Sequence, residues 1–307
     1  MPLPFLPDSA RHLTERTSIE QFAKIAAIDL STGIAPRPIR TTYIRDGQAG
    51  DRAPFLLLHG FDSSLLEYRR LQPRLSETRE TYSIDLLGFG FTDRTAGSRF
   101  APEDIDRHLH AFWKATIDRK VILVGASMGG VAAMRFALHY PEAVERLVLL
   151  DSAGIANGPL LGKLLFPPLD RLATGFLRRP SVRRNISRSA YFDKQLNTED
   201  ACLCAALHLE MPEWQQALIA FTKSGGYPSI RTQTGNLSLP TLVLWGRNDK
   251  ILGTKDAAIF ERNLPGGKLV WLDRCGHVPH LEVPEASAQQ ILDFCESSER
   301  ITATETT

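Results

Sequence analysis

Short runs of apolar and β-favouring residues recur along the chain, each bounded by polar or turn-forming residues. They lie at residues 55–58, 81–84, 121–124, 147–150, 241–244 and 269–272. Such continuous runs are typical of strands that are buried on both faces. Stretches with helical periodicity separate several of them, one over residues 102–116 and another over 128–139. Alternating strands and helices predict an α/β fold, with a mostly parallel, doubly wound sheet covered by helices on both faces.

The alternation stops after Asp151, and the next run with the character of a strand begins only at Thr241. A structureless loop of that length is uncommon inside a compact domain. We therefore predict a helical cap over residues 155–236, inserted after the sixth strand. One cap helix is expected to begin near Trp214 and to end at Gly225-Gly226.

Residues 18–30 have the spacing of an amphipathic helix. Ser18 and Gln21 match a capping box at its start, and Gly33 follows as a residue that commonly ends a helix. We expect the chain to divide into an N-terminal extension with this helix (1–40), an α/β core (41–154 and 237–297), the helical cap (155–236) and a C-terminal tail (298–307).

Charge and cysteine content narrow the classes of function. The 36 basic and 35 acidic residues give a formal net charge of +1, so no global basic field favours nucleic acid as a partner. Residues 155–190 are an exception, with seven basic residues and one acidic residue. The four cysteines are too few for a disulfide scaffold, which indicates a reducing compartment, and no Cys-x-x-Cys pair suggests a zinc or redox site. No signal peptide or membrane-spanning run is recognisable, and we expect a cytoplasmic or peripheral membrane protein.

The segment Gly125-Ala126-Ser127-Met128-Gly129 follows a predicted strand and opens a predicted helix. A serine nucleophile in this position needs small neighbours, because a sharp turn must present its hydroxyl above the sheet edge. The turn also puts the hydroxyl at a helix N-terminus, where partial positive charge favours a developing oxyanion. A serine in an ordinary glycine-rich turn is the alternative interpretation. The flanking strand and helix favour a nucleophile.

A nucleophilic serine requires a base to accept its proton and an acid to orient that base. Asp249 and His277 each follow a predicted strand, in the expected order, so both would lie at the same sheet edge as the serine. Asp151 also ends a strand, and His280 lies three residues beyond His277, so both remain alternatives. Gly276 favours His277, because glycine allows the loop to bring that imidazole close.

An oxyanion hole requires two backbone N–H groups, one from the residue after the nucleophile and one from a loop after an upstream strand. Met128 and Phe61 occupy these positions. His59, two residues before Phe61, is expected to fix the loop through hydrogen bonds rather than to act as a base.

The succession of strand, His-Gly-Phe loop, serine elbow, late aspartate and later histidine resembles the α/β-hydrolase fold over residues 41–296. Several segments are also similar to the chlorophyll dephytylases of plants and cyanobacteria: residues 58–64, 66–69, 85–93, 112–114, 224–227 and 275–282. Phe-Trp-Lys at 112–114 and Ser-Gly-Gly-Tyr at 224–227 discriminate best. The related pheophytinases carry Pro where this chain has His59, so the resemblance favours the dephytylase branch. No chloroplast transit peptide is recognisable, so we expect a cyanobacterial source rather than a plant one.

This resemblance implies hydrolysis of the phytyl ester of chlorophyll to chlorophyllide and phytol, with Ser127, His277 and Asp249 as the triad. It implies no cofactor and no metal site in the protein, since magnesium would arrive within the substrate. A general carboxylesterase, a lipase or a carbon–carbon bond hydrolase would share every one of these residues. A non-hydrolytic receptor of the same fold is an alternative from another class.

A substrate with a long apolar tail requires an apolar pocket and access to a membrane. The candidate pocket residues are aromatic residues of the cap: Phe166, Phe176, Phe192 and Trp214. The leucines and arginines of the cap also suit contact with an anionic lipid surface, which in a cyanobacterium would be the thylakoid membrane. Packing of these apolar residues onto the core is the alternative interpretation.

Overall fold

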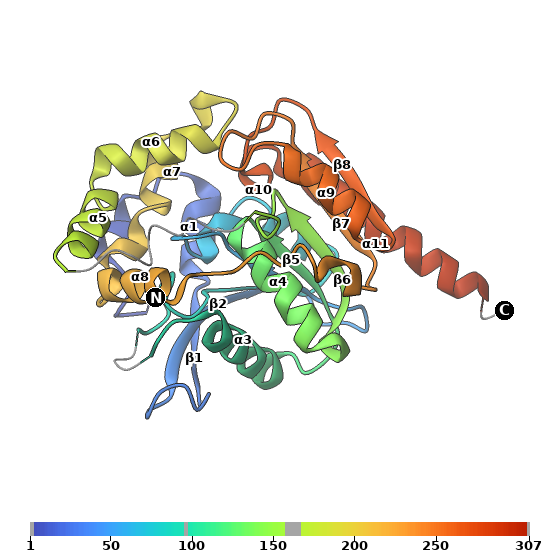
Figure 1. Cartoon of the computed structure of the whole chain (residues 1–307), viewed down its shortest axis with the longest axis horizontal. Helices are drawn as coiled ribbons and strands as arrows, with labels where there is room; N and C mark the ends of the chain where they lie inside the picture. The colour runs from blue at the N-terminus through green and yellow to red at the C-terminus, as the bar shows by residue number, and fades with distance from the viewer. Residues whose placement is uncertain (1–2, 95–97, 157–166, 306–307) are drawn as a thin grey trace.

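The computed structural model describes residues 3–94, 98–156 and 167–305, and its centre is an eight-stranded sheet (Figure 1). The strands are β1 (Ala26–Leu30), β2 (Ile39–Asp46), β3 (Phe55–Leu58), β4 (Thr81–Ile84), β5 (Val121–Ala126), β6 (Val144–Leu150), β7 (Thr241–Gly246) and β8 (Gly267–Leu272). Their order is β1-β2-β4-β3-β5-β6-β7-β8, and β2 is antiparallel to both neighbours while every other pair is parallel. The predicted mostly parallel sheet is thus confirmed.

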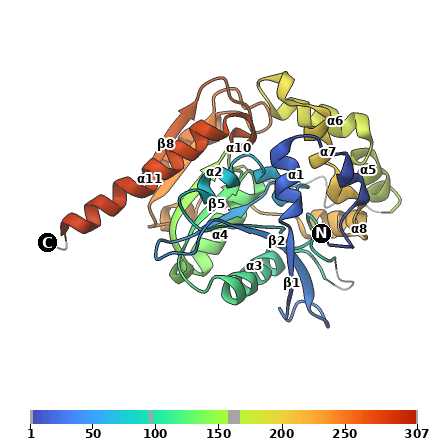
Figure 2. The same cartoon turned by 180° about the vertical axis from the view of Figure 1, so that it is seen from behind.

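Side chains of the central strands alternate between two hydrophobic cores, one on each face of the sheet. Leu56 and Leu58 belong to the first core, with residues of α3 (Pro102–Thr116), α4 (Met128–His139) and α9 (Lys255–Asn263). Phe55 and Leu57 belong to the second core, with residues of α2 (Gln72–Ser76) and of α11 (Pro284–Glu305), which runs out to the C-terminus (Figure 2). Because both faces are covered, the central strands β3 and β5 carry no polar side chain.

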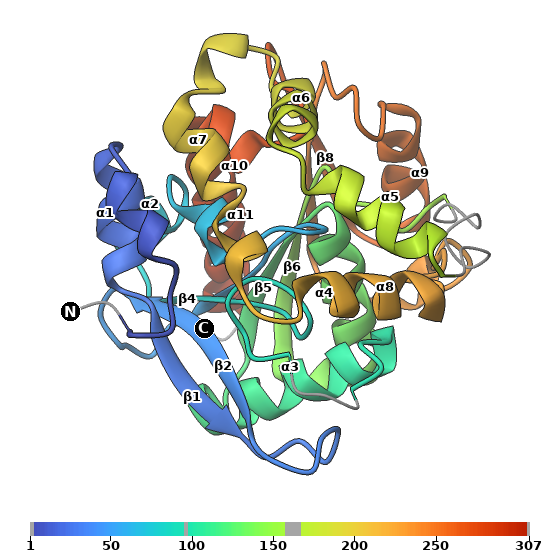
Figure 3. The same ribbon diagram turned by 90° about the vertical axis from the view of Figure 1, so that its left-hand side faces the viewer.

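Among the described residues between β6 and β7, four α-helices form the cap: α5 (Leu169–Leu177), α6 (Pro180–Ala190), α7 (Glu199–Cys204) and α8 (Trp214–Ser224) (Figure 3). The helix predicted from Trp214 to the glycine pair is α8, and Gly225 ends it in the left-handed conformation with φ of 97°. A helical insertion after the sixth strand is therefore confirmed. No helix in the described ranges is long and apolar enough to cross a membrane.

Short elements complete the described part of the chain. They are the four-residue helix α10 (Pro279–Glu282) and the 3-10 helices η1 (Asp8–His12), η2 (Leu65–Tyr68), η3 (Pro141–Ala143), η5 (Lys194–Leu196), η6 (Leu207–Glu210) and η7 (Thr234–Asn236).

The helix predicted over residues 18–30 is wrong in its second half. Helix α1 spans Arg16–Ala23, and β1 then pairs antiparallel with β2, with Ala26 opposite Tyr43. Gly33 lies in the turn between the two strands with φ of 69° and does not end a helix. Pairing with β2 outweighs the helical spacing of these residues, because it satisfies the backbone hydrogen-bonding groups of β1 that face β2. The segment before residue 41 therefore contributes β1 and the start of β2 to the sheet.

The predicted capping box at Ser18 is also wrong. Ser18 is buried within α1, and its hydroxyl donates to Asp200 of the cap at 2.5 Å. Asp200 instead accepts from the backbone N–H groups of Thr14 (2.5 Å) and Glu15 (2.8 Å) at the start of the helix. A cap residue distant in sequence thus satisfies two backbone amides immediately before α1, which the local sequence pattern does not reveal.

Candidate active site

Ser127 lies in the sharp turn between β5 and α4. Its backbone has φ of 51° and ψ of −116°, a strained conformation for a residue with a side chain, and its N–H donates to the carbonyl of Leu150 at 3.0 Å. Small neighbours are required here: a Cβ at Gly129 would lie 2.0 Å from the Leu58 carbonyl oxygen, and one at Gly125 would lie 2.3 Å from the Gly129 carbonyl oxygen. This is the geometry of a nucleophile elbow.

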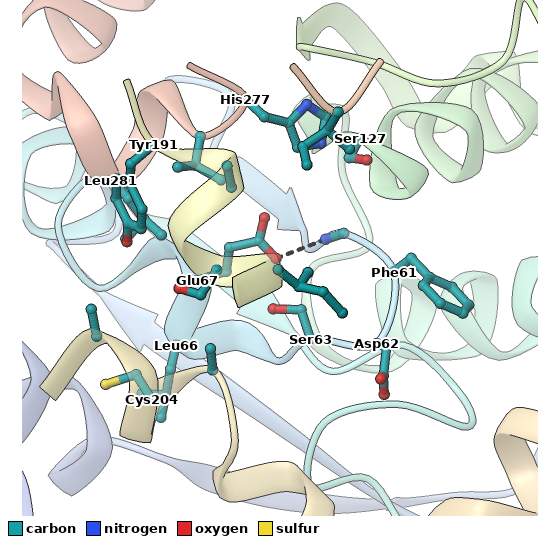
Figure 4. Close-up of a pocket in the computed structure, with 18 of the residues that line it drawn as sticks. Phe61, Asp62, Ser63, Leu66, Glu67, Ser127, Tyr191, Cys204, His277 and Leu281 are labelled. Carbon is teal, nitrogen blue, oxygen red and sulfur yellow. Dashed lines mark hydrogen bonds between the residues drawn. The ribbon is translucent and has the colours of Figure 1, made fainter. Parts of the chain in front are cut away.

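His277 and Asp249 form the acid–base pair that the sequence predicts. His277 Nδ1 lies 2.9 Å from Asp249 Oδ2, and Asp249 Oδ1 accepts from the N–H groups of Ile251 (2.7 Å) and Leu252 (3.1 Å). The carboxylate is thereby fixed in orientation, so it holds the imidazole through Nδ1 and leaves Nε2 for a reacting proton. His277 lines the same pocket as Ser127, and Figure 4 displays the two side chains next to each other.

The close approach of the His277 loop depends on Gly276. A Cβ at Gly276 would lie 2.2 Å from the Ala190 carbonyl oxygen at the end of α6. The His277 N–H donates to that same carbonyl at 2.7 Å. The cap therefore contacts the backbone that carries the imidazole.

The alternative acid, Asp151, lies beside the pair, but the imidazole hydrogen-bonds to Asp249. It is fully buried at the end of β6, and its Oδ1 accepts from the Gly246 N–H at 3.0 Å. Burial and the charge of Asp249 raise the pKa of Asp151 well above its usual value. Burial therefore disfavours the charged form of Asp151, and Asp249 is the carboxyl group that hydrogen-bonds to His277.

Asp151, Asp249 and His277 are also the group of possible metal ligands that the described residues bring together, with ligand atoms within 4.8 Å of one another. Both oxygens of Asp249 already bond to His277 or to backbone N–H groups. A hydrogen-bonded acid–base set accounts for this arrangement without a metal ion.

Met128 and Phe61, the two residues expected to form an oxyanion hole, both lie close to Ser127. Met128 is the first residue of α4, and the first amides of a helix have no partner within it. Phe61 follows β3 and lines the pocket with Ser127. A Cβ at Gly60 would lie 3.5 Å from Ser127 Cβ, so the loop that carries Phe61 passes directly beside the serine.

His59 fixes this loop. The Leu86 N–H donates to His59 Nε2 at 3.1 Å, so that nitrogen is an acceptor and the proton of the neutral ring is on Nδ1. Nδ1 then donates to the Gly60 carbonyl at 2.8 Å. Both ring nitrogens are occupied and the side chain is fully buried, which matches the predicted structural role.

The alternative base, His280, pairs with Glu67, a residue to which the sequence pattern assigns no role. Its Nε2 lies 3.0 Å from Oε1 of Glu67, and Oε2 of Glu67 accepts from the Gly60 N–H at 2.9 Å. Burial opposes ionisation of Glu67, but the adjacent His280 outweighs it and lowers the pKa to about 2. Glu67 is therefore a buried carboxylate that anchors the Phe61 loop. Its segment is recognisable as a motif, but the sequence alone does not reveal which backbone N–H it accepts from.

The pocket next to Ser127 has a volume of about 260 Å³ and lies between the Phe61 loop and the cap. Its apolar lining comes mainly from Leu66, Ile186, Tyr191, Cys204, Ile251 and Leu281 (Figure 4).

Three of the four predicted aromatic pocket residues are described by the structure, and none of the three lines this pocket. Phe176 is half exposed on α5 beneath Arg179, and Phe192 is 40% exposed on a separate surface. Trp214 is buried, and its indole N–H donates to Asp62 at 2.8 Å. Phe166 lies outside the described residues. The aromatic character of these residues does not reveal which face of each cap helix meets the core, and the prediction for Phe176, Phe192 and Trp214 is wrong for this reason.

Comparison with known proteins identifies the family. The model of the alpha/beta hydrolase fold matches residues 53–284. The alpha/beta hydrolase domain-containing protein VTE7 of Arabidopsis thaliana is 33% identical over 249 residues, covering 80% of this chain and 75% of that protein. The 2-hydroxy-6-oxo-2,4-heptadienoate hydrolase of Pseudomonas putida is 26% identical over 283 residues, covering 89% of this chain and 96% of that protein.

Solved structures have the same fold. A meta-cleavage product hydrolase from Pseudomonas fluorescens has a TM-score of 0.74 at 22% identity, covering 90% of this chain and 99% of that one. A thermophilic esterase from Thermogutta terrifontis also has a TM-score of 0.74, at 24% identity, covering 89% and 98%. The protein thus has the fold of an α/β hydrolase, a serine at the nucleophile elbow, and a histidine hydrogen-bonded to a carboxylate beside it. Together these features define a hydrolase of the α/β type. The chain belongs to the α/β-hydrolase family.

Proposed function

We propose that the protein is a serine ester hydrolase that cleaves the phytyl ester of chlorophyll to chlorophyllide and phytol. The observation that carries the reaction type is the convergence of Ser127 and the His277–Asp249 pair on one apolar pocket beside the Phe61 loop. The substrate is supported by the dephytylase-like motifs of the sequence and by the plant relative VTE7.

The reaction follows from the positions of these groups. Ser127 Oγ attacks the ester carbonyl as its proton passes to His277 Nε2, and the N–H groups of Phe61 and Met128 stabilise the negative charge that forms on the carbonyl oxygen. The carbon–oxygen bond to phytol breaks, and His277 returns the proton to the departing alkoxide. Water then attacks the acyl-enzyme with His277 as base. Chlorophyllide leaves as the acid, and Ser127 recovers its proton.

The size of the pocket indicates which part of the substrate it takes. A volume of about 260 Å³ is below the range of roughly 300–1,000 Å³ of sites that enclose a whole drug-sized ligand. The flexible phytyl chain suits such a space better than the rigid, flat ring does. The exposed side chains of Phe61, Ile186 and Ile251 line the same pocket, and they offer apolar surface for the ring outside.

We also propose that the cap docks on an anionic membrane. On α5, Leu169, Leu172 and Phe176 are exposed at helical spacing. Exposed arginines accompany them at positions 171, 178, 179 and 188. Apolar side chains among arginines suit a lipid surface of negative charge. Flotation with phosphatidylglycerol vesicles should carry the protein at low salt and not at high salt. Leu172→Glu should abolish binding, and failure of the unaltered protein to float at low salt would contradict the proposal.

The test of the reaction uses the protein and its Ser127→Ala variant. Each is incubated with detergent-dispersed chlorophyll a, pheophytin a and p-nitrophenyl butyrate, and pigments are followed by chromatography. Release of chlorophyllide that disappears in the variant supports the proposal. Turnover of the short ester alone would leave an esterase with another substrate, and binding of pigment without turnover would favour a receptor.

Arg69 favours a second candidate function, hydrolysis of an acidic substrate. Its side chain is only 2% exposed and lines the pocket. Its Nε and Nη2 have no hydrogen-bond partner among the described residues. A buried guanidinium of this kind suits a carboxylate, and the Pseudomonas putida relative is named for a carboxylate substrate.

Two p-nitrophenyl esters of equal length, one of them with a terminal carboxylate, separate the two candidates. Preference for the acidic ester that is lost in Arg69→Met would favour the second function. Equal or greater activity on the neutral ester in both proteins would favour the apolar substrate.

A further inference from the structure

Asp62, the residue after Phe61, is held by side chains of the cap. Its Oδ1 accepts from Trp214 Nε1 at 2.8 Å and lies 3.1 Å from His208 Nε2. Its Oδ2 accepts from Arg183 Nη1 at 2.7 Å. In Figure 4, Asp62 extends from the loop on the side away from Ser127 and His277, so it does not contact the reacting groups itself.

Asp62 is thus a buried carboxylate with a polar partner at each of its two oxygens. Its side chain is 6% exposed in a site where burial alone would favour the neutral acid. Despite burial, the hydrogen bond and charge of His208 and the charge of Arg183 hold the pKa of Asp62 well below its usual range. Charge-assisted hydrogen bonds to a carboxylate are among the stronger ones in proteins.

The cap also fixes the backbone at this position. Arg183 Nη2 donates to the Asp62 carbonyl at 3.1 Å and to the Ala205 carbonyl at 3.0 Å, so one guanidinium joins the loop to two cap segments. Asp62 has φ of 49°, in the left-handed region that non-glycine residues seldom adopt. Such a conformation persists where the surroundings over-determine it.

Phe61 is therefore anchored on both sides. On the core side, Glu67 accepts from the N–H of Gly60 at 2.9 Å. On the cap side, Asp62 accepts a hydrogen bond from Arg183, and the ring of Phe61 packs against that of Phe221 on α8, with 5.9 Å between the ring centroids. The orientation of the Phe61 N–H thus depends on where the cap sits.

We infer that Asp62 is a positioning residue that couples the cap to the oxyanion hole, so that seating of the cap over the pocket orients the Phe61 N–H toward the reacting carbonyl. The inference rests on the proposed hydrolysis through Ser127 and not on the identity of the ester. It predicts that loosening the Asp62 contacts weakens binding of the transition state more than binding of the substrate.

Adjacent residues of α6 provide a matched control. Arg183 contacts Asp62, whereas Arg184 pairs with Glu199 at 2.6 Å on the cap surface and does not line the pocket. Arg183→Met and Arg184→Met each remove one cap ion pair, but only the first loosens the loop. A merely structural role for Asp62 would lower the melting temperature in Asp62→Ala and leave the kinetics of the folded protein unchanged.

The experiment measures kcat and KM with p-nitrophenyl butyrate and the Kd of phenylboronic acid, which forms a tetrahedral adduct on Ser127. Loss of an oxyanion donor costs about 100- to 1,000-fold in kcat, so misorientation should cost about 10- to 100-fold. We expect that loss in Asp62→Ala and Arg183→Met, with a similar weakening of boronate binding, KM within about threefold and Arg184→Met unchanged. Asp62→Asn, which keeps an acceptor for Trp214, should recover part of the activity.

The inference is overturned if folded Asp62→Ala keeps its kcat and boronate affinity, if KM alone changes, or if Arg184→Met loses as much as Arg183→Met. Should Asp62→Ala fail to fold, Trp214→Phe removes only the indole donor and is judged by the same two readouts. The boronate measurement needs no turnover, so it separates failure of this inference from failure of the proposed ester hydrolysis.

Discussion

The contrast between Asp249 and Asp151 yields the sharpest prediction about the site. Both carboxyl groups lie close to His277, but only Asp249 hydrogen-bonds to Nδ1 of the imidazole, at 2.9 Å. Asn at position 249 would keep the size of the side chain and remove the charge that holds the imidazole in the required tautomer. Asn at position 151 would replace a carboxyl group whose charged form burial disfavours, and its oxygen can still accept from the Gly246 N–H.

The expected magnitudes differ widely. Loss of the orienting carboxylate in a serine triad lowers kcat by about 10⁴-fold, which corresponds to about 5.4 kcal/mol of transition-state stabilisation. The kcat of Asp249→Asn should therefore fall nearly to the residual level of Ser127→Ala. Asp151→Asn should remain within about tenfold of the unaltered protein, or within about 1.4 kcal/mol.

The assay is kcat for a p-nitrophenyl ester at neutral pH, with the melting temperature of each variant measured alongside. A loss in Asp151→Asn as large as that in Asp249→Asn would refute this reasoning and assign the acid to Asp151. Retention of more than a tenth of the activity in Asp249→Asn would also refute it, because Asp151 would then be able to replace the missing carboxylate.

Three further predictions concern stability. The pKa of Asp151 is raised in the folded protein, so its contribution to stability is full below the pKa of the unfolded chain and is lost as pH rises through the folded value. Melting temperatures measured from pH 4 to 9 should therefore decline less in Asp151→Asn than in the unaltered protein, and parallel curves would contradict this. Gly129→Ala should destabilise by at least about 3 kcal/mol or prevent folding, because its Cβ would lie 2.0 Å from a backbone oxygen; unchanged urea unfolding would contradict this. Asp200→Ala should cost about 1.5–3 kcal/mol, because it removes the carboxylate acceptor of the Thr14 and Glu15 N–H groups just before α1; an unchanged free energy of unfolding would exclude that role.

Local patterns predicted the part of the fold that carries the chemistry. The helices over residues 102–116 and 128–139 have the predicted bounds, because helical periodicity and the turn after β5 define their ends. Ser127, Asp249 and His277 meet at one edge because each follows a parallel strand, and parallel strands bring their carboxyl ends together.

Contacts between distant segments account for the errors. Residues 26–30 have helical spacing but pair with β2, and the amides at the start of α1 are satisfied by Asp200 of the cap. Glu67 and Asp62 anchor the Phe61 loop from opposite sides, and the partner of Asp62 in the cap, Arg183, is far away in the sequence. The aromatic residues of the cap were assigned to the pocket by type alone, whereas the orientation of each helix decides which side chains reach it.

The central claim is hydrolysis of a phytyl ester through an acyl-enzyme on Ser127, and turnover of chlorophyll a in water enriched in oxygen-18 tests it most directly. The account predicts chlorophyllide and phytol in equal amounts, one heavy oxygen in the new carboxyl group, none in phytol, and no reaction with Ser127→Ala. Heavy oxygen in phytol, or chlorophyllide release that survives the Ser127→Ala substitution, would contradict it.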